Sequence, residues 1–225
     1  MAKKGGKLQE PNDTRVRKVF KDIVYDAALK GKLGANAKGS LGWFRAKLAK
    51  FNRITAEEMM REAVRNKKRL EYGKMYMFVY DAKHKDTLPY WDAFPLIFAV
   101  GKAPGGFYGI NLHYLPYKFR IVLLDALFSI ASDKRFDERT KLKLSYSVLK
   151  GASKYKYFQP CLKHYLTGHV ESPFMRIEAT EWPIAIFLPV ERFQKRTKQT
   201  VWKHSEALFA RSKRRGPPKK TKGKK

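Results

Sequence analysis

The 225-residue sequence has one cysteine, few acidic residues and no long apolar run. Cys161 stands alone, which excludes an intramolecular disulfide and a cysteine-based metal site and favours a reducing compartment. No stretch reaches the roughly 18 uninterrupted apolar residues of a membrane helix. The first residues carry no apolar run of the kind that forms a signal peptide. We therefore expect an intracellular protein with no membrane partner.

Acidic residues are outnumbered by basic ones, 20 Asp and Glu against 49 Lys and Arg, which gives a net charge of +29. The excess is concentrated at the ends of the chain. Residues 1–73 carry a net +11 and residues 191–225 a net +12, whereas residues 74–190 carry +6. Such a surplus repels itself unless a polyanion neutralises it, so nucleic acid is the expected partner.

The C-terminal stretch is the most biased part of the sequence. From Arg211 to Lys225, nine of fifteen residues are Lys or Arg and none is acidic. This composition cannot bury a core, so it predicts a disordered arm that follows phosphates, with a solubilising tail as the alternative. Basic residues on the predicted N-terminal helices could also bind phosphates. At residues 67–69 the alternative is that they only complement the dipole of the predicted helix at its C-terminus. The candidate nucleic-acid-binding residues are Arg15, Arg17, Lys18, Lys21, Lys67, Lys68, Arg69, Arg211, Lys213, Arg214, Arg215, Lys219, Lys220, Lys222, Lys224 and Lys225.

Between the basic ends, the apolar patterning predicts an α+β fold. The expected core is a small antiparallel sheet or partly closed barrel with flanking helices and disordered basic termini. We divide the chain into a basic N-terminal arm with one amphipathic helix (1–39), a globular domain (40–194) and a basic helix with a disordered tail (195–225). Helices are predicted over 14–28, 40–51, 55–70, 116–128, 137–149, 157–166 and 190–209, and strands over 74–81, 95–100, 107–112, 173–179 and 184–188.

Three groups of residues interleave aromatic rings with basic side chains, at 117–120, 155–158 and 202–204. Rings of this kind can stack on exposed bases while the cations hold phosphates. More often they are core aromatics with basic side chains that extend to solvent, and we favour that interpretation.

No set of residues forms a convincing catalytic or metal site. The histidines lack metal-ligand spacing, and residues 101–109 lack the ending of a phosphate-binding loop, so a hairpin turn is the better interpretation. Asp81, Asp86 and Asp92 could bind Mg²⁺ in a nuclease, but turn chemistry explains them more simply. We therefore expect no enzyme activity, no metal and no cofactor.

Three segments occur together in a characteristic order: Gly73–Gly101, Gly105–Leu127 and Glu181–Gln194. The most specific part is a run in which Tyr80-Asp81-x-Lys83 is followed by Leu88-Pro89-Tyr90 and Phe94-Pro95-Leu96. Over roughly residues 40–205, the chain resembles structural proteins of T-even-like tailed bacteriophages of the DNA end protector type.

This resemblance implies a virion protein that lies near the end of the packaged genome, at the head–tail junction, and caps the DNA against exonucleases. It implies DNA and other virion proteins of the portal, neck or tail as partners, several copies in a symmetric assembly, and a stay in the host cytoplasm during assembly. A tail or baseplate adaptor, with the aromatic-rich domain as a protein–protein interface, remains the alternative.

Overall fold

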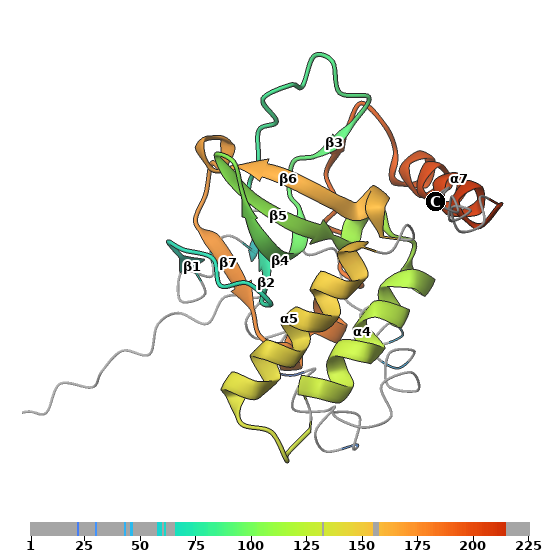
Figure 1. Cartoon of the computed structure of the whole chain (residues 1–225). Coiled ribbons are helices and arrows are strands. Elements are labelled where there is room, and N and C mark those ends of the chain that lie inside the picture. Colours follow the sequence, from blue (N-terminus) through green and yellow to red (C-terminus); the bar gives the residue numbers. More distant parts are fainter. Residues whose placement is uncertain are drawn as a thin grey trace, which may run out of the picture.

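The computed structural model describes residues 66–131, 133–154 and 158–214, together with Asp22, Lys30, Trp43, Ala46, Glu58, Met59 and Arg61. Its centre is an open antiparallel sheet of six strands in the order β1-β7-β2-β4-β5-β6 (Figure 1). A separate two-stranded ribbon pairs β3 with β8. The strands are β1 (Asn66–Lys67), β2 (Met75–Met77), β3 (Trp91–Asp92), β4 (Leu96–Ala103), β5 (Gly106–Asn111), β6 (Leu162–Leu166), β7 (Phe174–Ile177) and β8 (Phe193–Gln194).

Helices cover the ends and one side of this sheet. Figure 1 shows α4 and α5 side by side, with α7 set apart from them on the side of the molecule where β6 begins. None of the helices in the described part of the chain is long and apolar enough to cross a membrane. The helices are η2 (Leu112–Tyr114), α4 (Tyr117–Ala131), α5 (Glu138–Lys154), η3 (Gln159–Cys161), η4 (Thr167–His169), η5 (Ala179–Glu181), α6 (Trp182–Ala185) and α7 (Lys198–Arg214).

Strand β2 is buried on both faces, as the apolar alternation of residues 74–81 predicted. Met75 and Met77 in β2 belong to one core cluster, and Tyr76 between them belongs to the other. The first cluster continues into α4, α5 and α6. The second is rich in aromatic rings that meet edge to face: Phe78, Tyr80, Phe107, Tyr165 and Phe174. The prediction that this strand is central is confirmed, since β2 lies between β7 and β4.

The predicted α+β fold is confirmed, in its antiparallel-sheet form, because the sheet does not close into a barrel. The predicted hairpin is present as β4 and β5, with a tighter turn in which Gly105 has a φ of +66°. The predicted helices after Pro116 and over 137–149 are α4 and α5, and the predicted strand over 173–179 is β7.

Four element predictions are wrong in part or whole. Within the helix predicted over 157–166, residues 159–166 form η3 and strand β6, because the segment completes the sheet beside β5. Residues 184–188 lie in α6 and the turn after it, since a short apolar run fits a buried helix as well as a strand. The helix predicted over 55–70 does not reach its end, because Asn66–Lys67 pair with β7. Helix α7 begins eight residues later than predicted, after β8.

The predicted helices at 14–28 and 40–51 lie outside the described residues, except that Asp22, Trp43 and Ala46 are helical. Of the predicted C-terminal arm, residues 211–214 are the last turn of α7 rather than part of a disordered tail. Helix α7 packs on the core through Val201, which is fully buried.

Candidate nucleic-acid interface

A cavity of about 470 Å³ lies between the edge strand β6 and the loop that joins β2 to β3. That loop projects from the top of the molecule in Figure 1. The volume is within the range of about 300–1,000 Å³ that is usual for sites of small ligands. The lining residues are Tyr80, Ala82, Lys83, His84, Leu88, Tyr90, Trp91, Asp92, Tyr114, Lys163, His164, Tyr165 and Leu166.

One wall of the cavity is β6, which is held close to β5. Gly106 lies opposite Leu166 in the ladder, and a Cβ on this glycine would overlap the carbonyl oxygen of Tyr165. The absence of a side chain at Gly106 therefore lets the two backbones meet. This register places Lys163, His164 and Tyr165 on the wall.

The opposite rim is the loop 81–90, which the segment after β8 holds in place. Lys195 has a left-handed backbone, with φ of 64°. Its ammonium donates to the carbonyl oxygens of Asp86 at 3.1 Å and Leu88 at 3.2 Å, and also to that of Lys85. A single side chain thus satisfies three loop carbonyls and fixes the shape of the rim.

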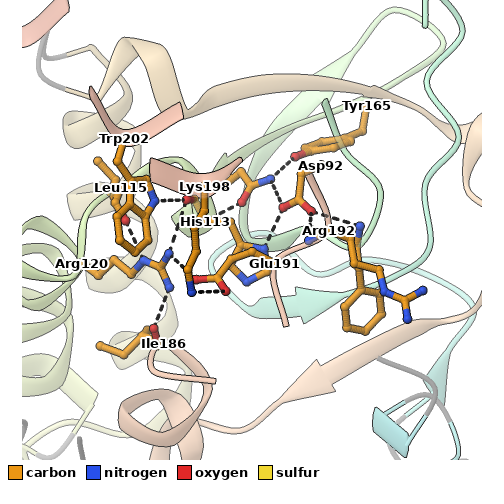
Figure 2. Close-up of polar contacts among 12 residues, drawn as sticks. Asp92, His113, Leu115, Arg120, Tyr165, Ile186, Glu191, Arg192, Lys198 and Trp202 are labelled. Atoms are coloured by element: carbon orange, nitrogen blue, oxygen red, sulfur yellow. Dashed lines mark hydrogen bonds and ion pairs between the residues drawn. The ribbon is translucent and has the colours of Figure 1, made fainter. Parts of the chain in front are cut away.

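The floor of the cavity is a buried polar network around Asp92 (Figure 2). Its Oδ2 accepts from His113 Nδ1 at 2.7 Å and from Asn111 Nδ2 at 3.0 Å. Its Oδ1 accepts from the amides of Phe94 and Arg192. Burial by itself raises the pKa of the Asp92 carboxyl, but the attraction of His113 and these hydrogen bonds outweigh it and hold the pKa below its usual range.

The network continues from the floor into β6. Asn111 donates a second hydrogen bond to the Tyr165 hydroxyl at 3.0 Å, while its Oδ1 accepts from the His113 amide. Burial raises the pKa of Tyr165 and of Tyr114 well above 10, so both lining phenols are neutral. The floor is therefore rigid, and the charge of its carboxylate is already compensated.

Behind the floor, Arg120 of α4 is fully buried and makes four hydrogen bonds (Figure 2). The guanidinium ties together segments that are far apart in the sequence. Its acceptors are the carbonyl oxygens of Leu115 (2.8 Å), Ile186 (2.7 Å) and His113 (3.4 Å), and the carboxylate of Glu191 (2.9 Å).

Helix α7 joins the same network. Trp202 Nε1 donates to the His113 carbonyl at 2.8 Å, and Lys198 lies 3.8 Å from the second oxygen of Glu191. Burial raises the pKa of the Glu191 carboxyl, but the electrostatic effects of His113, Arg120 and Lys198 outweigh it and hold that pKa below its usual value. His204, further along α7, bonds through Nδ1 to the Tyr90 hydroxyl at the cavity.

The cations of the cavity have few anionic partners. Lys163 makes no hydrogen bond or ion pair with any residue that the structure describes, and its ammonium lies 4.0 Å from the centre of the Tyr114 ring. Burial lowers the pKa of Lys163. Lys83, His84 and His164 are exposed at the rim. Among the described lining residues the only carboxylate is Asp92, so the cavity favours an anion.

The arrangement suits binding better than bond cleavage. His113 is fully buried, so its imidazole cannot touch a ligand in the cavity. Two of the three aspartates of the nuclease hypothesis are engaged by the protein, because Asp81 pairs with Lys85 at 2.9 Å and Asp92 bonds to His113 in the floor. Over the described ranges, no three or more His, Cys, Asp or Glu side chains are grouped to hold a metal ion. The cavity lining is therefore characterised by aromatic rings that lie beside basic side chains.

A family model described as phage T4 terminal DNA protecting protein matches residues 9–206. The chain belongs to this family. The resemblance to DNA end protectors is thereby confirmed. Searches of curated proteins and of solved structures find no match. The span matched to the terminal DNA protecting family contains the whole cavity and the polar network beneath it.

The structure describes only some of the basic residues that the sequence analysis proposed for nucleic-acid binding. Lys67, Lys68 and Arg69 are exposed, with Lys67 in β1 and the other two directly after it, so none of the three is in the last turn of a helix, as the helix-dipole interpretation had required. Arg211 is exposed on α7, which also contains Lys213 and Arg214. The other predicted residues lie outside the described part: Arg15, Arg17, Lys18, Lys21, Arg215, Lys219, Lys220, Lys222, Lys224 and Lys225.

The cavity itself was missed by sequence reasoning. Its aromatic and basic residues also lie close together in the sequence, at 83–91 and 163–165, which resembles the signal used for the three groups proposed from sequence. That signal could not show that the two segments meet, because residues 157–166 were predicted to be helical. Of the three groups, Tyr117 and Trp202 pack against each other as core aromatics, as favoured.

Proposed function

We propose that this chain is a non-enzymatic virion protein that binds packaged DNA near its end and protects that end from exonucleases. The observation that carries the proposal is the match to the terminal DNA protecting family over residues 9–206. A protein that shields DNA needs affinity and coverage rather than a reacting group. The fully buried His113 and the compensated Asp92 are consistent with this role.

The charge supports DNA as the ligand. A net +29 neutralises phosphates and releases their counterions, which is the main source of sequence-independent DNA affinity. Binding through about six phosphates should lose on the order of a thousandfold in affinity between about 50 and 200 mM salt. The basic residues at both ends of the chain would supply most of these contacts.

The place of action follows from the same proposal. A protein that caps the end of a packaged genome would lie at the head–tail junction of the virion, after a period in the host cytoplasm during assembly. It would contact portal, neck or tail proteins there, and the symmetry of that junction would favour several copies. Copurification with portal or neck proteins from disrupted particles is the expected result.

The deciding experiment is a competition between DNA forms at about 150 mM salt. The full chain is offered a linear duplex and a covalently closed circle of the same sequence. We expect a clear preference for the linear form and slower digestion of that form by an added exonuclease. Equal binding of the two forms would contradict end protection. Negligible DNA binding together with tight binding to another virion protein would instead favour the tail or baseplate adaptor.

The non-enzymatic part of the proposal has its own test. The same linear and circular DNA, incubated with the chain and either Mg²⁺ or Mn²⁺, should stay intact. Metal-dependent cleavage that disappears in Asp81→Ala would contradict the proposal and restore the nuclease hypothesis.

A further inference from the structure

The accessible part of the cavity combines two aromatic rings with cations. Tyr90 and Trp91 are partly exposed, whereas the other lining rings are buried in the floor and wall. Tyr90 is held by its hydroxyl on His204 and by its ring against Tyr114, and Trp91 lies beneath the Lys195 ammonium. Rings that are fixed in this way offer stacking surface with little loss of conformational freedom on binding.

Lys163 indicates the charge of the ligand. It is a partly buried ammonium beside a Tyr114 ring, with no carboxylate partner in the described part of the chain. A cation that is partly removed from water and left without a counterion gains strongly from a nearby anion. Lys83 at the rim adds positive charge on the solvent side of the cavity.

The only described carboxylate in the lining, Asp92, is already engaged by hydrogen bonds from the protein. Both oxygens of Asp92 already accept hydrogen bonds from the protein, two each. These bonds disperse part of its negative charge and leave it little capacity for a metal ion. The remaining lining is apolar, neutral phenol or basic.

We propose that this cavity binds the terminal nucleotide of a DNA strand, with the base against Tyr90 and Trp91 and the phosphate near Lys163 and Lys83. The proposal rests on the proposed function and specifies how an end is distinguished from internal duplex. The combination of aromatic faces with cations is the usual means of holding an unpaired nucleotide without reading its sequence.

The size of the cavity explains why an end would be selected. A space of about 470 Å³ accommodates a small ligand such as one nucleotide, but not a base pair with its two backbones. An internal base would have to be flipped out of a stacked duplex, whereas a terminal base frays at less cost. The basic arms would hold any duplex, and the cavity would add affinity only where a strand ends.

The first test is site-specific photocrosslinking with the full chain. Separate duplexes carry 5-iododeoxyuridine at the 5′ terminus, the 3′ terminus or an internal position, and crosslinked peptides are identified by mass spectrometry. We expect one or both terminal labels to attach to Tyr90, Trp91 or Tyr114, and the internal label to attach elsewhere. Terminal labels that attach only outside the cavity, or internal labels that attach equally well inside it, would overturn the proposal.

The second test separates the cavity from the general DNA affinity. Lys163→Met removes the cavity cation, and Lys143→Met removes an exposed charge on α5, so the two variants have the same net charge. We expect Lys163→Met to lose about tenfold of the preference for linear over closed DNA, and Lys143→Met to keep it. Lys163→Arg should restore most of the preference. Circular dichroism checks that each variant is folded. If Lys163→Met does not fold, Lys83→Met at the exposed rim tests whether a cavity cation supports the preference for linear DNA.

The outcomes distinguish the two proposals. If the wild type prefers ends and both Lys163→Met and Lys83→Met retain that preference, the cavity assignment is wrong and the proposed function stands. If the wild type shows no preference for ends at all, the proposed function itself is contradicted, and the cavity proposal, which rests on it, is contradicted with it.

Discussion

Among single residues, Arg120 is the one whose hydrogen bonds another side chain is least able to reproduce. Its guanidinium is fully buried and bonds to four acceptors in different segments. Lysine keeps the charge but cannot present donors in the same planar fork. We expect Arg120→Lys to lower the free energy of unfolding by about 3 kcal/mol, measured by urea denaturation.

Arg135 provides the matched control for this substitution. It also pairs with a carboxylate, Asp133 at 2.7 Å, but its side chain is 82% exposed. Water replaces most of what that contact contributes, so Arg135→Lys should leave the unfolding curve unchanged within error. Equal losses in the two variants would contradict a special role for the buried guanidinium.

Asp92 makes stability depend on pH. Its folded-state pKa is held below the ordinary value of 3.8, so its contribution is present above about pH 4 and is lost as pH falls through the folded pKa. We expect Asp92→Asn to cost about 3 kcal/mol near neutral pH, because it breaks a buried pair with His113. Urea unfolding near pH 7 and at a pH well below 3.8 should show the gap between wild type and variant closing at the lower pH, because the pH has then fallen through the folded-state pKa of Asp92. A gap that is the same at both pH values would contradict the assignment.

The interactions of Asp92 and Arg120 could be predicted from the sequence only in part. Turn chemistry, the interpretation favoured for Asp92, is indeed present, since its Oδ1 accepts from the Phe94 amide two residues on. The hydrogen bond between His113 and Asp92 is formed across the fold, and no local sequence pattern predicts it. The basic residues among the aromatics at 117–120 were expected to extend to solvent, but Arg120 is buried. Its hydrogen bonds to Ile186 and Glu191, which are distant in the sequence, offset the cost of removing the guanidinium from water.

At the scale of elements, the pairing of β5 with β6 depends on a glycine. A methyl group at Gly106 would overlap the Tyr165 backbone, and the neighbouring strand cannot move away without breaking the ladder. We expect Gly106→Ala to destabilise the fold by about 2 kcal/mol or more. Gly168→Ala is the control, because a Cβ at Gly168 meets nothing within 4 Å.

Cys161 supplies a readout for this comparison. Its thiol is buried beside β6 and burial raises its pKa to about 12, so it should react with thiol reagents only when the chain opens. We expect Gly106→Ala to speed labelling of Cys161 well beyond the rate in Gly168→Ala. Equal labelling rates in the two variants would mean that the strand accommodates the methyl group.

Elements with a clear period were predictable, and short apolar runs were not. The alternation in β2 and the helical spacing in α4 and α5 each fit one kind of structure. Residues 184–188 are apolar at every position, so they fitted a strand or a buried helix equally well. The segment 162–166 became a strand because β5 offers it an open edge, which is a tertiary cause that its own sequence does not contain.

For the whole molecule, composition predicts the class of partner but not the shape of the site. The charge of +29 and its concentration at the chain ends are enough to indicate a polyanion. The cavity draws its lining from residues 80–92, from Tyr114 and from residues 163–166. Assembling it requires the order of the strands, which no local pattern supplies.

The contribution of the basic C-terminal stretch can be measured separately from the fold. Deleting residues 215–225 removes Arg215, Lys219, Lys220, Lys222, Lys224 and Lys225, and it leaves α7, which ends at Arg214. We expect DNA affinity to fall about tenfold or more at moderate salt, with the log–log salt slope shallower by about 0.9 for each phosphate that the chain no longer neutralises. Thermal unfolding should not change.

A second variant separates charge from chain length. Replacing the same six basic residues by Gln keeps all 225 residues and removes the same positive charge as the deletion. If the arm acts through phosphates, the two variants should lose the same affinity and the same salt slope. Full affinity in both would show that the C-terminal stretch takes no part in DNA binding. A loss confined to the deletion would assign its role to interactions other than charge.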